Sequence, residues 1–280
     1  MKKSIIVIMS ILWTLQNLYA QKLTGVYSKD LPEVVINKDV SLHILSPEPI
    51  QYVDISTHAI AGDLPLKNVL RMKILADSTN LIKKLGERLG IVTVVGESFI
   101  AQYALRYVDN SVYTFPTQIN ILPENMQPLD VPGISLTSKE IQDFSIRMLE
   151  KPEHRSLRKA NGFGMEARLN QIYGVGDYIF LDITYLNHTK LPFKVDEQRY
   201  KIEDKKISKA TNVQSVEIKP IWQLYSTDTI KRRYRNIYVL KKATFPGNKV
   251  LRIELTEKQI SGRVLTLQMK YSDILNAESL

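Results

Sequence analysis

The richest cluster of charged side chains in the sequence is a basic run in its C-terminal half. Lys231, Arg232, Arg233 and Arg235 stand close together, with one tyrosine among them. A buried core cannot accept that many unpaired charges, so we expect the run to be exposed or bound to anions. Arginine binds carboxylate or phosphate through paired hydrogen bonds, and an aromatic ring in a basic run could stack on a base. A solvated hairpin loop explains the same run and is the commoner case, so both interpretations stay open.

Other patterns that could carry chemistry are incomplete. The segment 162–167, GFGMEA, matches a dinucleotide fingerprint, but that fingerprint follows an apolar strand and here basic residues precede it. We interpret it as a turn. The segment 96–99, GESF, stops short of the nucleophile elbow G-x-S-x-G. The histidines stand too far apart in sequence for the His pair typical of zinc sites: His43, His58, His154 and His188. We therefore expect no enzymatic activity, no cofactor and no metal.

The composition is that of a folded globular protein. Of 280 residues, 44% are hydrophobic and 24% are charged, which excludes wholesale disorder and fibrous repeats. The length allows one large domain or two smaller ones. Because the sequence has no Cys, we expect no disulfide, no thiolate metal site, no cysteine nucleophile and no lipid-modified cysteine. The formal net charge of +9 favours anionic partners.

The first twenty residues have the layout of a secretory signal. Lys2 and Lys3 precede the apolar stretch 5–13, and Ala20 is the small residue before Gln21. The apolar stretch is shorter than the roughly 18 residues that a membrane-spanning helix needs. We expect cleavage between Ala20 and Gln21 and an exported protein, with an uncleaved N-terminal anchor as the alternative.

Residues 21–115 are predicted to form an N-terminal β domain. Short apolar runs separated by turn residues occur at 34–36, 40–44, 52–56, 69–75, 91–95 and 99–108. Several of these runs alternate apolar with polar residues, as a strand with one buried face does. Short strands at this spacing predict a β-sandwich.

A proline-rich segment follows this domain. Pro116, Pro123, Pro128 and Pro132 fix φ and remove backbone donors. We therefore predict an extended linker over 116–137.

An amphipathic helix is predicted over 138–155. Thr137 and Glu140 have the spacing of a capping box. Ile141, Phe144 and Met148 lie on one helical face, and we expect Phe144 and Met148 to be buried against a neighbouring domain.

Residues 156–280 are predicted to form a C-terminal β-sandwich domain. Ile179, Leu181, Ile183 and Tyr185 alternate with polar or aromatic neighbours. Further strands are expected at 199–203, 212–218, 237–240, 250–255 and 264–269. The predicted fold class is mainly β, with two β-sandwich-like domains joined by the proline-rich linker and the amphipathic helix.

The C-terminal half resembles a known family. Its blocks at 191–196, 199–206, 209–211, 218–220 and 239–246, together with Gln214, Gly262 and Arg263, have the order and spacing of the conjugative transposon protein TraN of Bacteroides-type bacteria. This resemblance covers most of residues 160–275. Residues 40–107 are similar more loosely, and 77–81 resembles the periplasmic TrbG and CagX type subunits of type IV secretion systems.

The resemblance implies a structural subunit of a conjugative transfer complex in the cell envelope, on the outer-membrane side of the periplasm. The implied partners are other channel subunits, among them an outer-membrane lipoprotein and an inner-membrane-anchored subunit, in an oligomeric assembly without direct DNA binding. Alternatives from the residues alone are an exported carbohydrate-binding β-sandwich module and a periplasmic hydrolase with a dispersed active site. Trp222 is the only tryptophan after the signal that such a module could present to a glycan.

Overall fold

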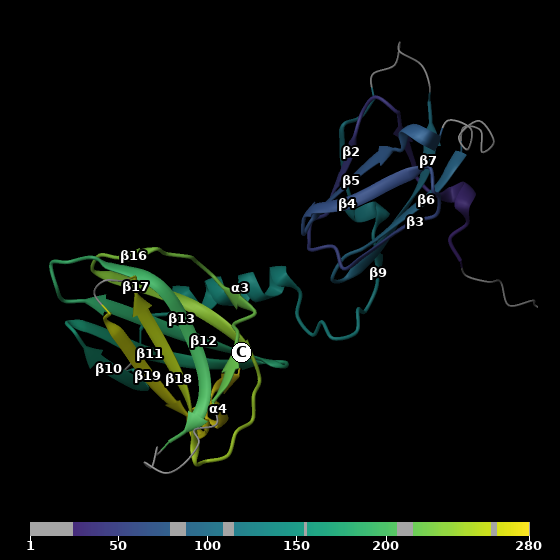
Figure 1. Ribbon diagram of the computed structural model, residues 1–280. Helices are drawn as coiled ribbons and strands as arrows, with labels where there is room; N and C mark the ends of the chain where they lie inside the picture. The colour runs from purple at the N-terminus through teal and green to yellow at the C-terminus, as the bar shows by residue number, and fades with distance from the viewer. Residues whose placement is uncertain are drawn as a thin grey trace, which may run out of the picture. The chain divides into compact units, whose positions relative to one another are not determined.

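The chain folds into two compact, mainly β units, Met1–Leu129 and Asp130–Leu280. The computed structural model describes residues 25–78, 88–108, 115–153, 156–205, 215–258 and 262–279. Figure 1 follows the chain from purple and blue in the N-terminal unit to green and yellow in the C-terminal unit. The prediction of a mainly β fold is confirmed.

The N-terminal unit contains two sheets. The first has the strand order β1-β7-β6-β3, with β9 beside β7: β1 (Glu33–Ile36), β7 (Phe99–Tyr107), β6 (Arg88–Val95), β3 (Tyr52–Ile55) and β9 (Gln127–Pro128). The second has the order β4-β5-β2-β8: β4 (Ile60–Leu66), β5 (Val69–Ile74), β2 (Leu42–Leu45) and β8 (Gln118–Asn120). Short 3-10 turns lie at η1 (Ser28–Asp30), η2 (Ala76–Ser78) and η3 (Pro123–Asn125).

One hydrophobic cluster fills the space between these sheets. Ile44 and Met72 enter it from the second sheet, and Val92, Val94 and Leu105 enter it from the first. The alternating burial along β5 and β7 is what period-2 side-chain alternation produces when one face of each sheet is covered. The N-terminal unit is therefore a β-sandwich.

Part of the predicted linker belongs to this sandwich. β8 pairs in parallel with β2, and β9 pairs with β7. The prolines do not prevent this, because Pro123 occupies the first position of a 3-10 turn and Pro128 ends a two-residue strand, where a missing donor matters least. The segment between the two units is accordingly shorter than the predicted 116–137.

The C-terminal unit also contains two sheets. The first has the order β10-β11-β12-β17-β15, with β20 beside β11: β10 (Arg158–Gly162), β11 (Met165–Val175), β12 (Tyr178–Asn187), β17 (Arg233–Lys241), β15 (Trp222–Gln223) and β20 (Glu278–Ser279). The second has the order β14-β13-β18-β19, with β16 beside β13: β14 (Val216–Ile218), β13 (Phe193–Asp204), β18 (Lys249–Glu257), β19 (Val264–Lys270) and β16 (Thr229–Ile230). Two helices are described, α3 (Ser138–Glu150) and α4 (Tyr271–Leu275).

Strand β12 is buried on both faces. Ile179, Leu181 and Ile183 point into the core between the two sheets. Tyr178 and Phe180 point to the opposite face and pack beneath α3. The alternation expected from the sequence is therefore present, and α3 covers the second face of the strand.

Helix α3 begins with the predicted capping box. The backbone N–H of Thr137 donates to Glu140 Oε2 at 2.8 Å, and the N–H of Glu140 donates to Thr137 Oγ1. The helix ends at Glu150 and not at the predicted residue 155, because Pro152 keeps the preceding residue out of the α region. Met148 is fully buried and Phe144 is half-buried, with its ring edge-on to Phe180.

Several strands lie where alternation alone did not predict them. β4 contains Gly62, Asp63 and Pro65, residues that are depleted from strands. β10 and β11 form a hairpin around the turn at 163–164.

Candidate functional site

The basic run 231–235 does not form a single loop. Lys231 and Arg232 occupy the turn between β16 and β17 and are exposed. Arg233 begins β17, and Arg235 follows two residues later on the same face of that strand. This is the face on which α3 lies.

Arg235 joins the end of α3 to the sheet. Its Nη2 and Nε donate to the two carboxylate oxygens of Asp182 at 2.7 and 3.0 Å. Its Nη1 and Nη2 also donate to the carbonyl oxygens of Leu149 and Lys151 at 3.0 and 3.1 Å. These carbonyls belong to the last turn of the helix, which lacks intrahelical partners and carries the negative end of its dipole. The hydrogen bond to Asp182 raises the pKa of Arg235 above its usual value.

A second tier of polar contacts surrounds this arginine. Arg233 forms an ion pair with Glu153, and Thr184 Oγ1 donates to Glu153 Oε1 at 3.1 Å. Asn170 Nδ2 donates to Asp182 Oδ1 at 3.0 Å and to Thr184 Oγ1 at 2.8 Å. This cluster fills the polar half of the sheet face on which α3 packs.

The structure therefore separates the four predicted partner-binding residues. The side chain of Arg235 is only 12% exposed and stabilises the fold by joining α3 to β12. Arg233 forms an ion pair with Glu153. The period-2 alternation of β17 directs both toward the helix. A partner-binding role for Lys231 and Arg232 stays a prediction.

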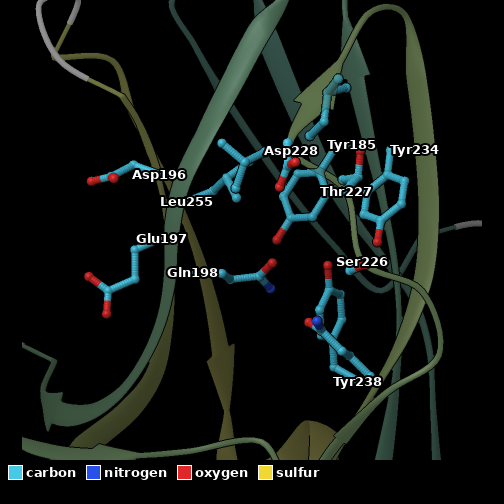
Figure 2. A pocket seen from close by; sticks show the side chains of 13 residues that line it. Tyr185, Asp196, Glu197, Gln198, Ser226, Thr227, Asp228, Tyr234, Tyr238 and Leu255 are labelled. Carbon is cyan, nitrogen blue, oxygen red and sulfur yellow. The ribbon is translucent and has the colours of Figure 1, made fainter.

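A cavity of about 240 Å³ lies between the two sheets of the C-terminal unit. Figure 2 shows three tyrosines in its wall, Tyr185 on β12 and Tyr234 and Tyr238 on β17. Gln198 of β13 faces them, and Ser226, Thr227 and Asp228 lie on the segment leading to β16.

The tyrosine hydroxyls of this cavity differ in their contacts. Tyr234 Oη donates to the carbonyl oxygen of Tyr225 at 2.9 Å and accepts from Asn236 Nδ2 at 2.9 Å. The hydroxyl of Tyr185 has no hydrogen-bond partner among the described residues. Burial, with a smaller contribution from Tyr234, raises the pKa of Tyr185 far above its usual value, so the phenol stays protonated. Tyr185 is therefore a buried, neutral phenol in the wall of the cavity whose hydroxyl the described residues leave without a partner.

The other sequence patterns have structural explanations. The 162–164 glycines form the turn of an antiparallel hairpin, whereas dinucleotide binding needs a parallel strand followed by a helix. His43 Nδ1 contacts the carbonyl oxygen of Thr117, and His188 contacts Glu166. Trp222 packs in the cluster beneath α3. His154 lies outside the described residues, as do Ala20 and Gln21.

The described ranges contain neither a cluster of metal ligands nor a membrane-spanning helix. No three His, Asp or Glu side chains there come close enough together to hold a metal ion. None of the helices in those ranges has the length and apolar character to cross a membrane.

Exposed apolar side chains at one end of the C-terminal sandwich were not singled out from the sequence. Phe163 and Leu191 are 64% and 70% exposed. A usable signal was present, because Phe163 stands between two glycines, where a hairpin turn is expected to present its side chain to solvent.

Comparison with known proteins places the C-terminal unit in a family. The model of the family described as a domain of unknown function, DUF4138, matches residues 139–279, half of the chain. The chain belongs to the DUF4138 family. Within it, the match spans α3 and the strands of both C-terminal sheets, so it includes the ion-pair cluster around Arg235 and the tyrosine cavity. No curated protein matches the chain.

Proposed function

We propose that this DUF4138 protein is an exported structural subunit of a conjugative transfer complex, acting on the outer-membrane side of the periplasm without catalysing a reaction. The observation that carries the proposal is the family match over 139–279, since DUF4138 domains occur in TraN-like proteins of conjugative transposons. The sequence blocks that resemble TraN fall within the same residues. Two sandwiches with separate cores suit a scaffold that offers several binding surfaces.

The proposed partners are other channel subunits, including an outer-membrane lipoprotein and an inner-membrane-anchored subunit. Sheet edges can bind such partners by strand addition. In the C-terminal unit, β14 and β19 are the terminal strands of one sheet. Exposed cations such as Lys231 and Arg232 would steer encounter with acidic partners.

The test is deletion of the gene from a donor strain, followed by measurement of transfer frequency and purification of tagged protein from donor envelopes. We expect transfer to fail and to be restored by the wild-type gene, and we expect channel subunits to co-purify. Normal transfer without the gene would overturn the proposal. A matched deletion of a gene outside the transfer region controls for effects on growth.

The tyrosine cavity favours a second candidate function, binding of a small glycan. Its phenolic and amide groups resemble the polar groups that orient a bound hydroxyl compound. Tyr185 and Tyr238 are buried, so the cavity suits a single sugar unit better than a polysaccharide chain. Calorimetric titration with monosaccharides, compared between the wild type and Tyr185→Phe, tests it. Equal heats for both proteins would reject this candidate.

A further inference from the structure

Three turns meet at one end of the C-terminal sandwich. They are the β10–β11 turn with Phe163 and Gly164, the β12–β13 loop 188–192, and the β16–β17 turn with Lys231 and Arg232. We call this end the three-turn tip. From its composition and geometry we propose that the three-turn tip docks on the surface of a lipid bilayer that carries anionic headgroups.

Buried Asn187 fixes the three turns relative to one another. Its backbone N–H donates to the carbonyl oxygen of Arg232 at 2.7 Å, and its Nδ2 donates to the carbonyl oxygen of Leu191 at 2.8 Å. The N–H of the next residue, His188, donates to the carbonyl oxygen of Gly164 at 2.9 Å. The exposed side chains of the tip therefore stand on a rigid base.

Phe163 occupies its turn at a conformational cost. Its φ is +53°, the only positive φ of a non-glycine residue in the described part of the chain. With Gly164 at φ +73° it forms a two-residue turn with two left-handed residues, where asparagine is preferred over bulky side chains. The ring gains little from packing, since it is 64% exposed. Strain of this kind, retained without a packing gain, points to a role in binding.

Two more apolar side chains lie at the same end. Leu191, between Lys190 and Pro192, is 70% exposed. Val264, at the start of β19, is 41% exposed. It belongs to this end because the adjacent Leu265 lies 3.8 Å from where a Cβ on Gly162 would stand. An aromatic ring and branched aliphatic chains on protruding turns can enter the boundary between headgroups and acyl chains.

The charge of the three-turn tip suits an anionic surface. Lys190, Lys231 and Arg232 are exposed and form no ion pair with another described residue. Two acidic side chains near these turns are paired, Glu153 with Arg233 and Glu166 with Arg168, whereas Asp196 and Asp228 are exposed. Asp196 and Asp228 line the tyrosine cavity. Apolar insertion surrounded by unpaired cations is the combination that binds anionic bilayers.

The inference does not depend on the proposed function, because it concerns only the surface of the C-terminal unit. A transfer subunit and an unrelated exported protein could both use the three-turn tip. Transfer frequency and vesicle binding are therefore separate readouts.

The test is co-sedimentation of the purified exported protein with vesicles of phosphatidylcholine alone or mixed with phosphatidylglycerol. We expect binding to the anionic vesicles and much weaker binding to the neutral ones. The triple variant Lys190→Gln, Lys231→Gln, Arg232→Gln should lose this preference, since each cation near an anionic surface strengthens binding about fivefold.

Phe163→Asn is the decisive variant. It places the preferred residue in the turn, so the free energy of unfolding should stay the same or rise, while vesicle affinity should fall about tenfold or more, because an aromatic side chain leaves the interface. The matched control is Leu275→Ser, which removes a 67% exposed side chain in α4, at the opposite end of β13, β18 and β19. It should bind vesicles as the wild type does.

Two results would overturn the inference. One is the absence of binding to anionic vesicles. The other is equal binding by Phe163→Asn, Leu275→Ser and the wild type. Loss of a co-purifying protein from Phe163→Asn, without any vesicle binding by the wild type, would assign the tip to a protein partner instead.

Discussion

Arg235 shows how one side chain can join three elements of the C-terminal unit. It contacts Asp182 on β12 and the last carbonyls of α3 from its own position on β17. The side chain of Asp182 is only 3% exposed. A buried ion pair of this kind adds little over a well-packed apolar pair, but removing one partner leaves an uncompensated charge.

Arg235→Gln should therefore lower the free energy of unfolding by about 3–5 kcal/mol, because it strands the Asp182 carboxylate. Urea denaturation of the purified protein measures this. Arg232→Gln is the matched control in the same basic run, and its effect should stay within about 0.5 kcal/mol as for other exposed sites. If the two variants lose similar amounts of unfolding free energy, Arg235 does not stabilise the fold through Asp182.

The difference between the buried Arg235 and the exposed Arg232 could not be predicted from the sequence. The run 231–235 reads as uniformly basic, and Asp182, the partner of Arg235, lies 53 residues earlier in the chain. Strand alternation places residues 233 and 235 on one face, but only the fold shows that a helix covers that face. The cavity tyrosines are likewise far apart in the sequence, and the pairing of β12 with β17 brings them together.

Helix α3 is held against the first C-terminal sheet by its apolar face. Met148 and Ile141 are buried against the sheet, and Phe144 packs edge-on to Phe180 with a centroid separation of 6.2 Å. The guanidinium of Arg147 lies over the Phe144 ring, 4.6 Å from its centroid. The helix thus supplies the third layer of the C-terminal unit.

Met148→Ala should lower the free energy of unfolding by about 2–5 kcal/mol, because it leaves a cavity beneath the helix. Phe144→Ala should cost less than the roughly 3–5 kcal/mol of a fully buried phenylalanine, since its ring is only partly covered. Thermal or urea unfolding measures both. Ile146→Ala is the control on the same helix, at a 37% exposed position, and should be near neutral. A near-zero effect of Met148→Ala would mean that the helix detaches from the sheet in solution.

The short helix α4 is attached to β10 by one ion pair. Arg158 Nε and Nη2 each donate to a carboxylate oxygen of Asp273 at 2.8 Å. Burial raises the pKa of Asp273, but hydrogen bonds from Arg158 and from the N–H of Lys270 lower it by more, and the net pKa lies below its usual value.

Asp273 should therefore contribute stability that is complete above the usual unfolded-state pKa of about 3.9. That contribution is lost as the pH falls through the lower pKa of the folded state. We expect Asp273→Asn to be less stable than the wild type near neutral pH, and the difference to shrink in acid. Urea titrations at several pH values measure this. Asp228→Asn, at an exposed position, is the control. A difference that is constant with pH would contradict the ion-pair explanation.

Helices and strands were predicted best from the sequence where several local signals agree. The capping box and the apolar stripe of α3 both indicated the helix, and it is present. β4 was missed because its Gly, Asp and Pro disfavour strands, and its pairing with β5 supplies what local propensity does not. The prolines of 116–129 suggested a linker because proline also disfavours strands. In the structure, β8 and β9 nevertheless pair there.

On the scale of the whole molecule, the two units have separate cores and meet in the chain at Leu129 and Asp130. The segment 131–136 contains no helix or strand. Connections with few contacts are the usual sites of domain boundaries.

Limited proteolysis should therefore cut within about 130–136 and release two stable fragments. Residues 21–129 and 130–280, expressed separately, should each unfold cooperatively. Mass spectrometry and thermal unfolding measure these outcomes. If both fragments are unfolded alone, the division into independent units is wrong.

Cleavage of the signal between Ala20 and Gln21 is a separate prediction for the whole chain. N-terminal sequencing of protein recovered from the cell envelope should begin at Gln21, because Ala20 is the small residue after the apolar stretch. Recovery of a chain that begins at Met1 would favour the uncleaved anchor.

The capping box of α3 affects where the C-terminal domain should be cut when it is moved into another protein. The family match begins at residue 139, two residues after the N-cap Thr137. A graft cut at that boundary would discard Thr137 and Leu136, the residue before it that packs under the helix. Losing an N-cap destabilises a helix by about 0.5–2 kcal/mol. The segment matched by the family model is thus shorter than the segment that folds. A version of this domain moved into another protein should begin near Asp130.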